Sequence, residues 1–162
     1  MGTILKGLQR IPWGTLEVPR GSARDIPGLL SKAAWADREN GDLALDRLAD
    51  LVCELGFVIS EATAPTVPFL LELAGAPQVA CKAETLKLLL NIYSSQEWSR
   101  SAAGALPKYA DNYTHKVQWE NDAHRAVLDG RHIIEGLADS VDPDVAEAAT
   151  KLLEAFAAEE GR

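Results

Sequence analysis

The sequence predicts an all-α fold in which about three helix pairs stack as a short α-solenoid. Two observations predict it: an apolar pattern returns at fixed offsets along the chain, and within each copy the apolar residues are spaced by three and four positions. No run of alternating β-branched residues bounded by turn residues competes with helix. A chain of 162 residues suits one hydrophobic core, so we expect a single domain.

Residues 1–24 are expected to form an N-terminal cap. The first pair of a helical stack leaves an apolar face open, and this segment supplies side chains that can cover it. They are Ile4, Leu5, Leu8, Ile11 and Trp13.

The first two helix pairs, over 25–56 and 64–95, are related by an offset of 41 residues. This offset carries the sequence IPGLL, which begins at Ile26, onto VPFLL, which begins at Val67. It also carries Leu48 onto Leu89. Several apolar positions in one register indicate a structural repeat.

The second helix of the first pair is expected to be amphipathic. Leu45, Leu48, Val52 and Leu55 are spaced by 3, 4 and 3, which places them on one helical face. The triplet Asn-Gly-Asp at 40–42 is expected to break the chain and cap this helix. In the second pair, Gly-Ala-Pro at 75–77 is expected to end a helix that begins near Thr66.

The third helix pair is expected over 119–159. An offset of 63 carries Leu71 onto Ile134 and Leu89 onto Leu152. Asp142 followed by Pro143 supplies an N-cap and a proline at the first helical position, which opens a helix that should run to about Ala158. The second offset exceeds the first by 63 − 41 = 22 residues, so an insertion is predicted between the second and third pairs, over 96–118.

Two stretches carry a family resemblance. Residues 21–30 read GSARDIPGLL, and residues 61–73 read EATAPTVPFLLEL. Together with Trp13, the period of 41 and the Leu-rich second helices, they resemble a group of small bacterial HEAT-like proteins. The resemblance covers most of the chain and is weakest across 96–117. It implies a HEAT-like fold and an interaction role, and it implies no reaction and no cofactor.

The charge of the chain limits its partners. Sixteen Lys and Arg residues against twenty-four Asp and Glu residues give a net charge of −8, and no basic cluster gathers on one face. We therefore expect no nucleic-acid partner, and the sequence disfavours a role like that of the HEAT-like DNA glycosylases. The chain lacks an apolar run typical of a signal peptide or a membrane span, so we expect no membrane partner and a cytoplasmic location.

No catalytic residue, metal ligand or cofactor site is predicted. The chain contains no nucleophile elbow, phosphate loop or dinucleotide fingerprint. Cys53 and Cys81 lie in apolar helical patterns and are expected to be core side chains. Glu120 and His124 are spaced as an ordinary surface pair on one helical face, as are Asp129 and His132, and such pairs fall short of a metal site.

An aromatic cluster marks the insertion as a candidate binding region. Five of the ten aromatic residues lie in or beside it, together with one histidine: Tyr93, Trp98, Tyr109, Tyr113, Trp119 and His115. Tyr and Trp give large contact areas, and insertions are where function is often added to a scaffold. The alternative is structural. Tyr93 and Trp119 would then complete the core, and Trp98 and Tyr109 would hold the insertion in place.

A second candidate surface is acidic. Asp46, Asp50 and Glu54 follow one another by four positions, so a helix would align them opposite the leucine face. Such a stripe is either an ordinary solvated face or a docking surface for a basic partner.

The leading hypothesis is a non-catalytic binding scaffold: a protein-interaction module that acts as an immunity-type or regulatory partner of a more basic protein. The alternative is a small-molecule-binding or self-protection protein, or an enzyme without a recognisable motif. In that case a pocket would be roofed by Trp98, Tyr109 and Trp119. A closed apolar cavity beneath these residues, with buried carboxylates, would favour the alternative.

Overall fold

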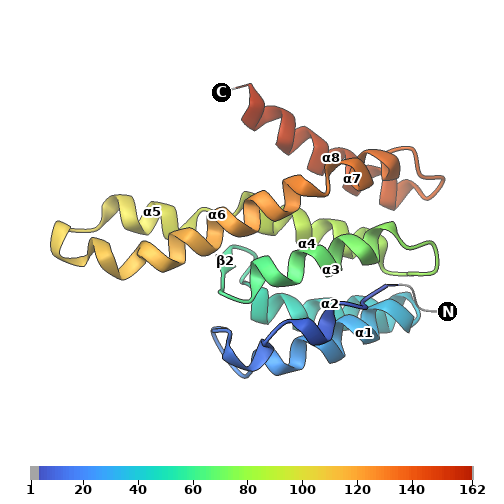
Figure 1. Ribbon diagram of the computed structural model, residues 1–162. Helices are drawn as coiled ribbons and strands as arrows, with labels where there is room; N and C mark the ends of the chain where they lie inside the picture. The colour runs from blue at the N-terminus through green and yellow to red at the C-terminus, as the bar shows by residue number, and fades with distance from the viewer. Residues whose placement is uncertain (1–3, 162) are drawn as a thin grey trace.

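The computed structural model describes residues 4–161 and is mostly helical over that range, which confirms the all-α prediction (Figure 1). The helices are α1 (Ile26–Trp35), α2 (Arg38–Val52), α3 (Thr63–Gly75), α4 (Lys82–Ser94), α5 (Glu97–Gly104), α6 (Thr114–Asp129), α7 (Arg131–Leu137) and α8 (Pro143–Glu160). Short 3-10 helices are η1 (Leu8–Arg10), η2 (Trp13–Thr15), η3 (Ala23–Asp25) and η4 (Pro107–Tyr113). Two short strands, β1 (Cys53–Glu54) and β2 (Val58–Ile59), pair antiparallel, which the sequence analysis did not predict.

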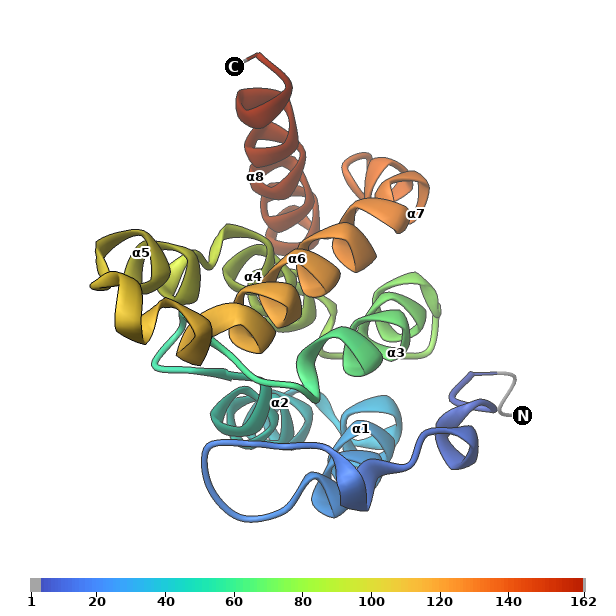
Figure 2. The ribbon, with the colours of Figure 1, turned by 60° about the vertical axis from the view of Figure 1, so that its left-hand side comes forward.

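Three helix pairs lie side by side in the molecule (Figures 1 and 2). α1 packs on α2, α3 packs on α4, and α7 packs on α8. Between neighbouring pairs, α1 contacts α3 and α3 contacts α7, while α2 contacts α4 and α4 contacts α8. Leu48, Leu89 and Leu152, which the two offsets align, are all fully buried in the one core that these helices share.

The start of α2 differs from the prediction. The helix opens directly after Asp37, whose side chain accepts the backbone N–H of Asn40 at 2.9 Å and caps it. The prediction that 40–42 breaks the chain was therefore wrong, since these residues lie in the first turns of the helix. A glycine suits position 41 because α2 passes close to Cys81. A Cβ at this position would lie 3.1 Å from the Cys81 Sγ.

α2 ends at Val52, where hydroxyl groups from the start of the next helix pair donate hydrogen bonds to its last carbonyl groups. The Ser60 hydroxyl donates to the carbonyl of Leu51 at 2.8 Å, and the Thr63 hydroxyl donates to the carbonyl of Val52. The chain then turns through β1 and β2, which leaves Leu55 75% exposed with φ at 59°. The prediction that Leu55 continues the buried face of the helix was wrong.

Two other helix boundaries agree with the sequence. α3 ends at Gly75 as predicted, although it begins at Thr63, three residues before the predicted start. α8 follows the Asp142 side chain, which accepts the N–H of Asp144 at 2.9 Å, and Pro143 is its first residue. The predicted N-cap of α8 is thereby confirmed.

The N-terminal segment lies across α1 and α3. The ring of Trp13 packs on that of Phe69 in α3, with 6.1 Å between the ring centroids. The backbone N–H of Glu17 donates to the carboxylate of Glu61 at 2.8 Å. The segment therefore connects the first helix pair to the second along one side of the molecule.

The predicted insertion is a hairpin that projects from the helix pairs (Figure 1). α5 runs outward, η4 turns the chain, and α6 returns to pack on α3 and α4. α6 passes through the predicted boundary at 118/119 without a break and ends before Gly130. A Cβ on Gly130 would lie 2.3 Å from Cδ2 of Leu71, so a larger residue in this turn would have to displace the Leu71 side chain.

Candidate functional site

The projecting hairpin, defined as residues 97–118, is fixed to the body at its base by Glu120. This side chain is 4% exposed. Its carboxylate accepts the backbone N–H of Trp98 at 2.7 Å, and both the N–H and the hydroxyl of Ser99 at 2.9 and 2.7 Å. These N–H groups belong to the first turn of α5 and have no partner within the helix, so Glu120 acts as the cap of α5.

Trp98 makes the second contact at the base of the hairpin. Its indole Nε1 donates to the carbonyl of Ile59 in β2 at 2.8 Å, and its partly buried ring packs against the core. On the hairpin itself, the Lys116 ammonium lies 4.3 Å from the Trp98 ring centroid, and the Tyr113 ring lies 6.3 Å from it. Trp98 and Tyr113 therefore lie within the contacts that hold the hairpin in place.

The tip of the hairpin exposes apolar side chains. Leu106 is 60% exposed and Tyr109 is 48% exposed, and the Lys108 ammonium lies 4.9 Å from the Tyr109 ring centroid. The hairpin carries three Lys and Arg residues and two Asp and Glu residues, which gives a local charge of 3 − 2 = +1 in a chain of charge −8. The acidic protein thus presents a positively charged hairpin with an exposed leucine and tyrosine.

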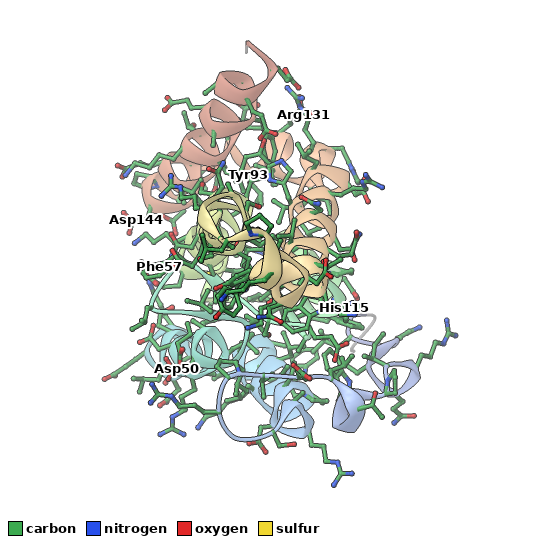
Figure 3. All side chains as sticks on the ribbon, turned by 90° about the vertical axis from the view of Figure 1, so that its left-hand side faces the viewer. Asp50, Phe57, Tyr93, His115, Arg131 and Asp144 are labelled. Atoms are coloured by element: carbon green, nitrogen blue, oxygen red, sulfur yellow. The ribbon has the colours of Figure 1, made fainter. Side chains whose placement is uncertain are left out.

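His115 and Trp119 line a different surface. They border an open groove of about 380 Å³ together with Leu16 of the N-terminal segment and Pro65 of α3. Viewed from the end of the hairpin, His115 and Phe57 lie to either side of it (Figure 3). The predicted aromatic cluster is therefore divided among the base of the hairpin, its tip and this groove.

The predicted acidic stripe is shorter than expected. Asp46 and Asp50 lie exposed on α2. Glu54 lies in β1, where its carboxylate is 3.1 Å from the Arg20 guanidinium and its side chain is 17% exposed. The prediction that a helix aligns all three carboxylates was wrong, because α2 ends at Val52.

A polar cluster that the sequence analysis did not bring together lies beside the base of the hairpin. The ring of Tyr93 on α4 stacks on that of His124 on α6, with 4.0 Å between centroids, and its hydroxyl donates to the carboxylate of Glu159 on α8. His124 Nδ1 lies 2.9 Å from the Tyr93 carbonyl oxygen, and Nε2 lies 3.0 Å from Glu159. The prediction of a Glu120–His124 surface pair was wrong, since each side chain bonds to another helix.

The protonation state of the Tyr93 hydroxyl follows from its surroundings. Burial, and then the neighbouring Glu159 carboxylate, raise the pKa of Tyr93 above its usual range. The phenol therefore stays protonated at neutral pH and acts as a hydrogen-bond donor to Glu159.

One sequence signal could have identified Glu120. Glu120, Ala123 and Val127 are spaced by three and four residues, and all three are buried on α6. A carboxylate in an apolar register indicates a buried partner, because burial without one is costly. No local pattern indicates the contact between Tyr93 and Glu159, which are 66 positions apart.

The polar cluster borders a groove of about 350 Å³ that lies between the start of α5 and the end of α8. Its lining also includes the polar side chains of Ser94, Gln96 and Arg100, and two alanines of α8, Ala155 and Ala158. The groove thus combines hydrogen-bond donors from the base of the hairpin with a small apolar surface from the last helix.

Cys53 and Cys81 are buried and free. Burial raises the pKa of the Cys53 thiol to about 11, and it raises the pKa of the Cys81 thiol as well. Both side chains are therefore thiols at neutral pH, and neither has the thiolate character of a reactive cysteine.

Comparisons with protein-family models, curated proteins and solved structures found no match. Over residues 4–161, no three His, Cys, Asp or Glu side chains are grouped so that they could hold a metal ion. In the same part of the chain, none of the helices combines the length and the apolar character that crossing a membrane requires.

Proposed function

We propose that the chain is a non-catalytic binding scaffold, a short α-solenoid of HEAT-like helix pairs whose projecting hairpin docks onto a partner protein. The side-by-side packing of the three pairs supports the scaffold part of the proposal. The projecting hairpin supports the binding part.

The observation that carries the proposal is the contrast between the base and the tip of the hairpin. The base is held by the buried Glu120 and by the indole of Trp98, while the tip exposes Leu106 and Tyr109. A surface that is rigid before binding loses little conformational entropy when a partner docks. Tyrosine is enriched among the residues that dominate protein–protein affinity, and an exposed apolar patch with a polar rim marks an interaction site.

A small-molecule pocket roofed by the aromatic residues of the insertion has less support. Such a pocket requires Trp98, Tyr109 and Trp119 to converge as a roof. Trp98 contacts β2 at the base, Tyr109 lies in η4 at the turn of the hairpin, and Trp119 borders a groove with α3. The three side chains therefore belong to three different surfaces.

The test is affinity capture with three forms of the chain, followed by quantitative mass spectrometry. The wild type is compared with the double variant Leu106→Asp/Tyr109→Asp and with the control Val141→Asp, which alters a fully exposed side chain before α8. We expect one protein that is enriched by the wild type and by the control. The tip variant should recover it at least about tenfold less, the usual loss when central contact residues are removed.

Two results would overturn the proposal. One is equal recovery of the captured protein by the tip variant and the wild type, with circular dichroism showing that all three forms are folded. The other is the absence of any protein that the wild type enriches over an unrelated helical bait.

A further inference from the structure

We propose that the groove between the start of α5 and the end of α8 binds a small organic carboxylate. The proposal does not depend on the partner of the hairpin tip, because the two surfaces share no residue. The volume of the groove, about 350 Å³, lies within the size range of small-molecule sites, roughly 300–1,000 Å³.

The polar atoms of His124 and Glu159 are engaged with each other and with Tyr93. The carbonyl oxygen of Tyr93 can only accept, and it lies 2.9 Å from His124 Nδ1. His124 Nε2 lies 3.0 Å from the Glu159 carboxylate. Because the Tyr93 hydroxyl also donates to Glu159, this carboxylate is already engaged.

Arg100 supplies the positive charge of the groove. The remaining lining residues are the His124–Glu159 pair, whose side chains lie 3.0 Å apart, and uncharged side chains. None of the six ion pairs found within residues 4–161 involves Arg100, and its side chain is exposed. Arg100 therefore brings an exposed guanidinium to this groove in a protein whose net charge is −8.

The lining matches a carboxylate that is attached to a short apolar body. A guanidinium binds a carboxylate through two parallel hydrogen bonds, and the Gln96 amide and Ser94 hydroxyl are further donors in the same groove. The methyl groups of Ala155 and Ala158 offer an apolar surface for the rest of the ligand. Inorganic phosphate has no apolar body and cannot use this surface.

The experiment is a titration of the ¹⁵N-labelled full chain with benzoate, followed by amide chemical shifts. We expect saturable shifts that are concentrated at residues 93–100 and 155–159, with a dissociation constant of about 1 mM or below, as expected of a ligand of this size. Benzamide, which has the same body without the charge, and inorganic phosphate should both bind at least about tenfold more weakly than benzoate.

Two variants assign the binding to Arg100. Arg100→Gln should weaken benzoate binding by about tenfold or more, and Arg100→Lys should restore part of it, because the charge returns without the second hydrogen bond. The matched control is Arg10→Gln, which removes an exposed arginine of η1, and it should leave the affinity unchanged.

Three outcomes would overturn the proposal. The first is that benzoate produces no saturable shift in the folded chain. The second is that Arg100→Gln binds benzoate as tightly as the wild type does. The third is that phosphate binds as tightly as benzoate, which would identify a general anion site without selection for an apolar body. Circular dichroism of each variant checks that the fold is retained, and the affinity capture with the tip variants is unaffected by any of these results.

Discussion

The Glu120 carboxylate accepts the backbone N–H of Trp98 at 2.7 Å, although 22 positions separate the two residues in the chain. The contact replaces a local cap, because Gln96, which precedes α5, forms no side-chain capping bond. An isolated helix of eight residues is not stable in water, so α5 depends on such tertiary contacts. The buried Glu120 carboxylate therefore fixes the start of α5, together with the bond from the Trp98 indole to the Ile59 carbonyl.

Replacing Glu120 with glutamine should loosen the base of the hairpin. The N–H groups of Trp98 and Ser99 bond to different oxygens of the carboxylate, so in the amide one of them would face the NH2 group, which cannot accept. We expect the free energy of unfolding to fall by about 1–3 kcal/mol. Amide hydrogen exchange at Trp98 and Ser99 should also accelerate. Asp129→Asn, at the exposed end of the same helix, is the control, and equal exchange rates in both variants would contradict the capping role.

Two glycines of the third helix pair should respond in opposite directions to alanine. Gly130→Ala would place a Cβ 2.3 Å from Cδ2 of the buried Leu71, so we expect a loss of about 1–3 kcal/mol of unfolding free energy. Gly136 lies in α7 with no atom within 4 Å of a Cβ, and Gly136→Ala should stabilise the protein by up to about 1 kcal/mol. Urea denaturation of both variants tests the pair, and a neutral Gly130→Ala would contradict the close approach of this turn to α3.

The helices that form the body could be predicted because their signals are local. Leu48, Leu89 and Leu152 recur in one register, and each is fully buried. The cap of α8 could also be predicted, since Asp142 and Pro143 adjoin the helix that they begin. Such features can be predicted from the residues within one or two helical turns of the position concerned.

The helix end beside Glu54 and the candidate sites were harder to predict from the sequence, because they depend on contacts between distant segments. The end of α2 depends on hydroxyl groups of Ser60 and Thr63, which bond to the carbonyls of Leu51 and Val52. The apolar spacing alone continues to Leu55, so the sequence predicts that the helix continues to this residue as well. The groove beside Arg100 likewise depends on the tertiary fold, since residues of α5 and of α8, which are remote in sequence, line it together.

The buried thiols should be unreactive in the folded protein. Burial raises the pKa of Cys53 to about 11, so at pH 8 only about one thiol in a thousand is ionised. In a Cys81→Ala variant, which leaves Cys53 as the single cysteine, a disulfide reagent should react at least about a hundredfold more slowly in buffer than in urea. Equal rates under the two conditions would mean that Cys53 is accessible in the folded state.

The contact between Tyr93 and Glu159 predicts a loss of stability at alkaline pH. Burial and the adjacent carboxylate raise the pKa of Tyr93 in the folded protein above the unfolded value of about 10. The folded state therefore keeps this proton to a higher pH than the unfolded state does. Above about pH 10 the unfolded state binds fewer protons, so the unfolding free energy falls as the pH rises, while below that pH the contribution is constant.

A Tyr93→Phe variant isolates this contribution, since phenylalanine retains the ring contact with Phe156 and lacks the titrating hydroxyl. At pH 8 the wild type should be more stable by about 1 kcal/mol, the usual value of a part-buried hydrogen bond. The difference should shrink between pH 9 and pH 11, because only the wild type loses stability through Tyr93 ionisation. Urea denaturation at each pH measures the difference, and a constant difference across this interval would show that the hydroxyl titrates alike in the folded and unfolded chains.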